Sequence, residues 1–517
     1  MISRLIIFLI FISALAFSFA CRTRTGGDTV TIALPEKFST LDTLTSKASD
    51  AAADRVRNLI FNSLVKKDEK FDYVGDLAQE IKTSDDGKTI SFVLRDNVKF
   101  HNGKTLSSAD IKYTFDELFK SESNKSNAFF ETVNNEKVPH ISAIETPDAK
   151  TVNFTLSRAS LKNQLLSNLV AIPIIPEGTV AQQNTQPVGS GPFKFVSFDQ
   201  QQNIVEFAAN PDYWEGAPKV QKIRLKTVTD AGSLTAELQS GGVDIAPLPN
   251  NLSPDTLNSL KQNSRLKVDQ FAGSNIDYLG LNTQSPPLDN VKIRQAIAYA
   301  VDREKIIGEL LAGQAVLAHS ILPVESWAYS DGVKYEFNPD RARQLVKESG
   351  YKNEPIKFKY SAGNSAVNQY AQVIQGFLKD VGLNVEIETL DPNTLRSQLG
   401  SGQFQMNTGR WIGGNQDPIF YRDLFSTGKI PTAKGGCCNR SRYSNPEFDK
   451  IVEEAFNTTD RERAKELYIK SQEIISRDVP LVPLWYPANM CVSNRRIGNV
   501  KIGASGDFTF IKDITVD

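Results

Sequence analysis

The chain has 517 residues, of which 40% are hydrophobic, and its formal net charge at pH 7 is −1. A chain of this length and composition can bury large cores, and we expect several domains. Because the charge is near zero and no basic stripe is interleaved with aromatic residues, we expect no nucleic acid partner.

The N-terminus has the pattern of a secretory signal. Arg4 precedes an apolar run over residues 5–19, and Ala20-Cys21 follows it. This run is too short to span a bilayer comfortably, so we expect a signal peptide over residues 1–20 and export to the periplasm. A lipoprotein signal would be cut before Cys21, whose acylated thiol would anchor the protein to a membrane. Ser18-x-Ala20 also suits an ordinary signal peptidase, so both forms of processing stay open.

Three cysteines remain after Cys21, and an exported protein can form disulfides. Adjacent cysteines rarely pair with each other, so we expect Cys491 to pair with Cys437 or Cys438. The three histidines, His101, His140 and His319, lie far apart in the sequence, and none has metal-ligand spacing. We therefore expect no metal site and no cofactor.

The first predicted elements are two strand regions separated by a helix. Residues 29–34 predict a strand, and residues 54–65 have the apolar spacing of an amphipathic helix. Residues 81–100 contain two strand-like runs around an Asp86-Gly87 turn. We expect the helix to pack on a sheet.

A helix start and a histidine follow this hairpin. Ser107 and Asp110 have the spacing of a capping box. We interpret His101, beside Asn102-Gly103, as a turn histidine, because no carboxylate or nucleophile lies at a recurrent offset from it.

Residues 188–214 combine unusual turn residues with two strand patterns. Gly189, Gly191 and Pro192 predict a tight entry, since glycine tolerates positive φ and proline fixes its own φ. Alternating residues over 193–197 and 204–207 then predict a β-hairpin. A phosphate loop would need a helix at this position, so we interpret Gly-x-Gly as a turn into a strand.

The second half alternates strands and helices. Residues 356–360 and 383–387 predict strands, and the helical stripe between them predicts a parallel β-α-β unit with a right-handed crossover. Ligands bind beyond the carboxyl ends of such strands, which directs the following loops toward a cleft. Residues 479–485 predict a return crossing to the first part of the chain.

Three sequence blocks resemble the periplasmic binding proteins for dipeptides, oligopeptides and nickel that feed ABC transporters, the family 5 solute-binding proteins. They are VGSGPFKF…NPDYW, DDGKTISFVLRDNVKFHNGKTLSSADIKYTFD and GRWIGGNQDPIFY. The resemblance implies an α/β, bilobed periplasmic-binding-protein fold of type II, with an extra subdomain in the first lobe and a monomeric state. The expected segments are a signal peptide (1–20), lobe I with its anchor linker (21–50), the extra subdomain (51–186), lobe I again (187–277), lobe II (278–484) and the lobe I return (485–517).

The resemblance also implies the ligand-binding residues. In peptide-binding relatives the loop that begins at Trp411 has the form W-x-x-D-x-x-D-P, and its first Asp holds the peptide amine. Here Gly414 occupies that position, so another acid such as Asp417 substitutes, or the ligand lacks that amine. The remaining expected contacts are Phe38, Tyr278, Asn282, Gly413 and Asn415.

The function expected from the resemblance is capture of a peptide-like solute between hinged lobes for delivery to the permease subunits of an ABC transporter. A nickel chelate is disfavoured because no His or Cys cluster is present, but it stays an alternative, since relatives bind such chelates largely through Arg and aromatic residues. A sensor or chaperone-like receptor of the same fold is an alternative. We do not expect an enzyme, because no G-x-S-x-G or H-E-x-x-H motif occurs, although paired carboxylates of an exported hydrolase would leave no signature.

Overall fold

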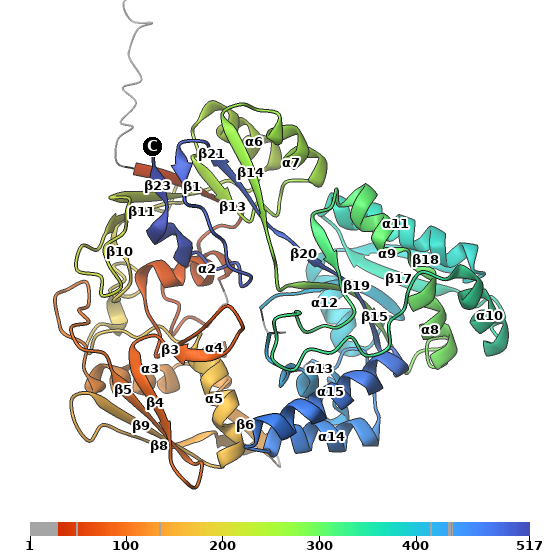
Figure 1. Ribbon diagram of the computed structural model, residues 1–517, viewed down its shortest axis with the longest axis horizontal. Helices are drawn as coiled ribbons and strands as arrows, with labels where there is room; N and C mark the ends of the chain where they lie inside the picture. Colours follow the sequence, from red (N-terminus) through yellow and green to blue (C-terminus); the bar gives the residue numbers. More distant parts are fainter. Residues whose placement is uncertain (1–28, 48–49, 134–135, 414–415, 433–435, 437) are drawn as a thin grey trace, which may run out of the picture.

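The computed structural model describes residues 29–47, 50–133, 136–413, 416–432, 436 and 438–517. Figure 1 shows two bodies side by side. We call lobe I the body that carries a seven-stranded and a four-stranded sheet, and lobe II the body that carries a six-stranded sheet. The architecture is the α/β bilobed fold that the resemblance implied, whereas the residue boundaries expected for each segment stay predictions.

The seven-stranded sheet of lobe I collects strands from distant parts of the chain. Near its middle, β1 (Thr29–Leu34) pairs in parallel with β12 (Lys222–Thr227), with Val30 opposite Ile223. In sheet order the strands are β10 (Phe193–Asp199), β11 (Ile204–Ala209), β12 (Lys222–Thr227), β1 (Thr29–Leu34), β13 (Ile245–Pro247), β21 (Asn489–Asn494) and β14 (Leu266–Phe271). Helices α2 (Ala51–Ile60), α6 (Ala231–Ser240) and α7 (Pro254–Lys261) also belong to this part of lobe I.

The hairpin predicted after Gly191 is confirmed as β10 and β11, but the reason for the glycines differs from the expected one. Neither Gly189 nor Gly191 is among the residues with positive φ. A Cβ on Gly189 would lie 2.1 Å from the carbonyl oxygen of Ile60, and one on Gly191 would lie 2.5 Å from the Ile60 carbonyl carbon. The glycines are therefore required by close backbone approach to the end of α2. That helix ends at Ile60 rather than at residue 65, because Phe61 is extended and Gly191 N donates to Ile60 O.

The four-stranded sheet is the second sheet of lobe I and lies apart from the seven-stranded one (Figure 1). The capping box predicted at Ser107 and Asp110 is confirmed at the start of α3. Phe92, Phe115 and Phe154 make edge-to-face contacts that join α3 to this sheet. The elements are β4 (Ala78–Thr83), β5 (Thr89–Leu94), β9 (Thr151–Leu156), β8 (Ile141–Glu145), α3 (Ser108–Lys120), α4 (Asn124–Asn127) and α5 (Lys162–Leu169), with the two-stranded pairs β2 (Val65–Lys67) with β3 (Tyr73–Gly75) and β6 (Phe130–Val133) with β7 (Glu136–Pro139).

Lobe II contains the predicted β-α-β unit. β17 (Ile356–Ser361) and β18 (Val385–Leu390) pair in parallel and are connected by α11 (Ser365–Asp380). The other strands are β16 (Ala315–Leu317), β20 (Leu481–Pro487), β15 (Ile276–Leu281) and β19 (Met406–Trp411). The other helices are α8 (Val291–Ala300), α9 (Arg303–Lys305), α10 (Pro339–Ser349), α12 (Pro392–Ser401), α13 (Phe420–Phe425), α14 (Pro446–Asn457) and α15 (Arg461–Asp478).

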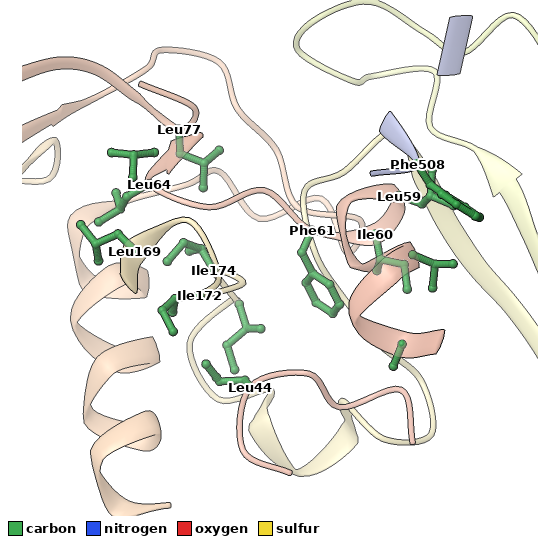
Figure 2. Packing of buried hydrophobic residues seen from close by; sticks show 14 of the residues in the cluster. Leu44, Leu59, Ile60, Phe61, Leu64, Leu77, Leu169, Ile172, Ile174 and Phe508 are labelled. Atoms are coloured by element: carbon green, nitrogen blue, oxygen red, sulfur yellow. The ribbon is translucent and has the colours of Figure 1, made fainter. Parts of the chain in front are cut away.

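The chain crosses between the lobes from β14 to β15 and returns from β20 to β21. After the return, the C-terminal segment packs onto lobe I, where Phe508 lies beside Leu59 of α2 (Figure 2). The same apolar cluster includes Ile419 and Phe456 of lobe II. The lobes are therefore in apolar contact as well as connected by two crossings.

The predicted disulfide of Cys491 is wrong. Cys491 is a free, fully buried thiol on β21, between β13 and β14 of lobe I. Cys438 is disulfide-bonded and packs against a lobe II core, while Cys437 lies outside the described residues. Because a disulfide requires its Cα atoms within about 7 Å, a thiol in the core of one lobe does not reach a cysteine in the other. Burial raises the pKa of the Cys491 thiol.

Among the helices that the structure describes, none has the length and apolar character needed to cross a bilayer. The predicted signal peptide and Cys21 lie outside the described residues.

Candidate functional site

A cavity of about 370 Å³ lies between the two lobes, beside the crossing segments. Lobe I contributes residues 229–231 and 248–254 to its wall, and lobe II contributes the start of α11 with Tyr370 and Arg410. Asp277, Trp485 and Pro487, from the strands next to the crossings, also line the cavity. The volume is at the lower end of the range typical of small-molecule sites, about 300 to 1,000 Å³.

An ion pair from adjacent strands lies in this wall. Asp277 of β15 is opposite both Arg410 of β19 and Trp485 of β20 in the sheet register. Arg410 Nε donates to Asp277 Oδ1 over 2.6 Å and Arg410 Nη2 donates to Oδ2 over 2.9 Å, while Trp485 Nε1 donates to Oδ2 over 2.8 Å. The nearby Asp277 carboxylate raises the pKa of Arg410. Bidentate geometry of this kind fixes the plane of the guanidinium group.

Three helices begin at the cavity. The residues that cap α6, α7 and α11 are Asp230, Ser253 and Asn364, and all three are lining residues. Each cap side chain accepts a backbone N–H from the first turn of its helix. Helix N-termini carry a partial positive charge, so the backbone dipoles make this space favourable for negative charge.

Trp411 and Tyr278, both predicted as ligand contacts, line a different and smaller cavity of about 30 Å³. Successive side chains of a strand point to opposite faces. Trp411 and Tyr278 therefore face away from their neighbours Arg410 and Asp277, and they pack against α13, with the rings of Trp411 and Phe420 centred 4.5 Å apart. A cavity of this size holds about one or two water molecules.

The loop after Trp411 is only partly described. Gly413 is exposed with φ +76°, and its N–H donates to Asn275 Oδ1 over 3.2 Å. Gly414 and Asn415 lie outside the described residues. How the solute amine is recognised without an Asp at position 414 therefore stays a prediction.

Asp417 is buried and bonded to lobe I. Its Oδ2 accepts the hydroxyl of Tyr73 over 2.5 Å, and its Oδ1 accepts the N–H of Ile419 over 3.0 Å. Burial, with Asp417 adding to it, raises the pKa of Tyr73 well above its ordinary value. Lys67 Nζ donates to the neighbouring Gln416 Oε1 over 3.0 Å. This loop of lobe II is thus held by β2 and β3 of lobe I.

The remaining two predicted contacts lie away from the cavity. Phe38 is buried in lobe I, where its ring meets Phe198 edge-on at 6.1 Å. Asn282 follows the end of β15 opposite to the Ile276 and Trp411 pair, and its side chain donates to Phe404 O and Gly402 O. The structure does not bring these two residues together with Trp411.

Tyr278 and Trp411 lie on the same strands as Asp277 and Arg410, but Asp277, Arg410 and Trp485 were not among the contacts predicted from sequence. A usable signal was present, because charged residues within apolar strands are rarely buried without a partner. Within the described chain, no group of three or more His, Cys, Asp or Glu side chains is arranged to hold a metal ion.

Comparison with known proteins agrees with this geometry. Residues 72–432 match the family described as bacterial extracellular solute-binding proteins, family 5 Middle. Oligopeptide-binding protein AppA of Bacillus subtilis is 29% identical over 524 aligned positions, which cover 95% of this chain and 93% of the relative. Heme-binding protein A of Haemophilus influenzae is 28% identical over 470 positions, covering 85% and 83%.

The fold is also similar to a solved structure. The putative peptide binding protein AppA from Clostridium difficile superposes with a TM-score of 0.81 at 26% identity, covering 95% of this chain and 100% of that one. Because the family match spans more than half of the chain, the assignment does not depend on any single relative. The chain belongs to family 5 of the bacterial extracellular solute-binding proteins, the substrate-binding components of ABC transporters.

Proposed function

We infer that this protein captures a peptide-like solute in the cavity between its lobes and delivers it, chemically unchanged, to an ABC permease. The observation that carries this inference is the cavity itself, whose walls come from both lobes. A solute that touches both walls binds the closed arrangement better than the open one, and only such differential affinity drives closure. The two crossings serve as the hinge.

The lining chemistry supports a peptide-like solute. Asn250, Asn251, Gln314 and Asn364 place amide groups around the cavity. Side-chain amides both donate and accept hydrogen bonds, as peptide groups require. AppA of Bacillus subtilis is an oligopeptide-binding protein by name, which favours the same class of solute here.

The peptide amine is not held at Asp417 in this proposal. Tyr73 and Ile419 already occupy both oxygens of that carboxylate. Of the alternatives that Gly414 leaves open, this arrangement favours another acid, or a solute without that amine, over Asp417.

Cellular placement is part of the same proposal. The protein is exported after removal of residues 1–20, acylated at Cys21, and works as a monomer beside its permease. Metabolic labelling with a fatty acid analogue tests the anchor, with Cys21→Ser as the control. Labelling of both proteins, or of neither, would contradict acylation at Cys21.

Native mass spectrometry of protein purified from its own compartment tests the capture function. We expect a co-purified solute of peptide mass, recovered unaltered after denaturation, and a smaller radius of gyration by small-angle scattering when it is added back. Solute conversion by pure protein, or no compaction with any member of a broad peptide and metabolite library, would overturn the proposal.

A further inference from the structure

The lobes also meet at a place away from the cavity. Helix α14 of lobe II packs against the short helix η1 (Ala159–Leu161) of lobe I. Leu161 and Phe456 of α14 are buried in one apolar cluster, and a Cβ on Gly87 of lobe I would lie 4.0 Å from Thr459 Cγ2. Figure 1 shows α14 close to α5, which follows η1, below the crossing segments. Rotation about the crossings separates these helices, so the η1–α14 contact belongs to the arrangement in which the lobes are close together.

His140 of lobe I lies beside the η1–α14 contact. Its carbonyl oxygen accepts the N–H of Ser157, two residues before η1, over 2.9 Å, and its own N–H donates to Phe129 O over 2.8 Å. The residue is 9% exposed, and among the described residues its Nδ1 has no hydrogen-bond partner. Both ring nitrogens of a charged imidazole are donors, so a proton on this ring would leave a buried N–H without an acceptor. The surroundings therefore favour neutral His140.

Two cations of lobe II act on His140, and both already have carboxylate partners. Arg422 Nε lies 2.8 Å from Glu453 Oε2, and its guanidinium carbon lies 4.0 Å from the ring centre of Phe456. Lys429 Nζ lies 3.1 Å from Asp423 Oδ1. Because these carboxylates are engaged by cations of their own lobe, they do little to stabilise a positive charge on the histidine.

The balance of these effects is a lowered pKa for His140, with burial as the main cause. Glu131 raises the pKa, but it pairs with Arg158 over 2.8 Å, and Arg158, Lys429 and Arg422 lower the pKa further. Opening of the lobes hydrates the ring and carries Lys429 and Arg422 away from it, so only the charges of lobe I remain beside it. The open arrangement therefore binds a proton on His140 more tightly than the closed one does.

We propose that His140 couples lobe closure to pH, so that a proton on its imidazole opens the η1–α14 contact and promotes release of the solute. This inference rests on the proposed function, because it needs lobes that close on a solute. A ligand that binds one of two arrangements more tightly shifts the population toward that arrangement, and here the ligand is the proton.

The ordinary pKa of histidine, 6.5, sets the range of this effect. Above pH 6.5 His140 is neutral in both arrangements, and closure is unaffected. As the pH falls below 6.5, the open arrangement takes up the proton and the closed one does not, so closure is lost. At about one pH unit below 6.5, a single group of this kind reduces the ratio of closed to open protein by at most about 10-fold.

The direct test follows the imidazole of His140 by NMR, in protein that carries ¹³C-labelled histidine. The chain has three histidines, so His140→Gln identifies the signal by its loss. We expect a lower pKa for His140 when a peptide selected by native mass spectrometry is bound than when the protein is free of solute. An equal pKa in the two states would overturn the proposal.

Calorimetry measures the consequence for binding. Between pH 7.5 and 5.5 we expect the affinity of wild type for the same peptide to fall about 3- to 10-fold, and that of His140→Gln to fall less than about 2-fold. Titration of the peptide, and of groups such as Asp76 that both proteins contain, cancels in this comparison. An equal fall in the two proteins would assign the proton to another group and overturn the role of His140.

The matched control is His319→Gln. Burial also lowers the pKa of His319, but the charged groups that act on it, at residues 303, 331, 334 and 336, belong to lobe II. This variant should keep the pH response of wild type, and its loss would contradict an effect specific to the η1–α14 contact.

Lys429→Gln gives a second measure that keeps His140 and so remains available if His140→Gln does not fold. Removal of this cation from lobe II should raise the pKa of His140 in the closed arrangement and make the loss of affinity at pH 5.5 smaller than in wild type. An unchanged or larger loss would contradict repulsion across the contact.

The two proposals fail differently. Binding and compaction with a peptide, at an affinity whose pH dependence does not involve His140, would leave solute capture standing and remove the proton coupling. The absence of any ligand would remove both.

Discussion

The hydroxyl of Tyr73, on β3 of lobe I, donates a 2.5 Å hydrogen bond to the buried carboxylate of Asp417 in lobe II. Lys67 strengthens the same contact, because its ammonium group lies 5.6 Å from the Tyr73 ring centre and bonds Gln416. Asp417 lies between the loop that starts at Trp411 and α13, which begins at Phe420, so this contact connects lobe closure to that loop. We call the contact of Tyr73 with Asp417 the interlobe bond.

Tyr73→Phe removes the interlobe bond and keeps the ring. Asp417 retains the N–H of Ile419, so we expect lobe II to stay folded while the open population rises. Apparent solute affinity should fall roughly 10-fold, because a hydrogen bond to a charged group contributes about 1.5 kcal/mol or more. Calorimetry measures the solute affinity, and small-angle scattering measures the open population. Tyr351→Phe is the control, since among the described residues its hydroxyl bonds Glu354 and Asn384, both within lobe II. An equal loss in this variant would contradict a role in closure.

Arg461→Ala tests a second contact between the lobes. Arg461 pairs with Asp72 of lobe I and stacks over Trp327, but its side chain is 56% exposed. Exposed ion pairs contribute about 0 to 1 kcal/mol and are screened by salt. We expect a decrease in affinity of no more than about 5-fold at low ionic strength, and no difference from wild type at high salt. A large effect that persists at high salt would mean that this pair dominates closure.

Gly189→Ala should destabilise lobe I strongly. Its Cβ would lie 2.1 Å from Ile60 O and 2.6 Å from the Phe61 ring, so the backbone has to move. Overpacking of this kind costs about 1 to 3 kcal/mol or more. Gly376→Ala, in α11, meets no atom within 4 Å and should stabilise the protein by about 0.5 to 1 kcal/mol. Denaturant unfolding measures both variants. If close approach is the cause, the free energy of unfolding falls in Gly189→Ala and rises in Gly376→Ala.

His101 joins two of the sequence blocks that carry the family resemblance. Its Nε2 bonds Gly191 O over 3.0 Å, and its Nδ1 accepts the N–H of Gly189. Burial lowers the pKa of His101 from 6.5 to about 4. A lowered folded-state pKa means that stability is fully present above pH 6.5 and is lost as the pH falls toward 4.

His101→Gln removes this titration and keeps a donor for Gly191 O. We expect the loss of unfolding free energy between pH 7 and 4.5 to be smaller in the variant than in wild type, by on the order of 2 kcal/mol. Burial raises the pKa of Asp76 to about 6, which acts in the opposite direction, but Asp76 is present in both proteins and cancels in the difference. Parallel pH profiles would show that His101 does not titrate in this range.

The hairpin after Gly191, the capping box at Ser107 and the β-α-β unit over residues 356–390 could be predicted from sequence alone. Their signals are period-two alternation, turn residues and helix caps, all of which depend on neighbours a few residues away. The family resemblance depends on the same local blocks. The class of the fold followed from them, and so did the expectation of a cleft near the loop at Trp411.

Only the tertiary structure decided which side chains meet. Arg410 and Asp277 are separated by 133 positions, and a one-residue change in strand register would have placed Tyr278 and Trp411 at the cavity instead. The free state of Cys491 and the engagement of Asp417 by Tyr73 likewise depend on contacts between parts of the chain that local pattern does not connect. Sequence therefore determined the elements and their order, whereas long-range packing determined the faces that they present to a solute, because strand register and lobe closure are set by burial over the whole chain.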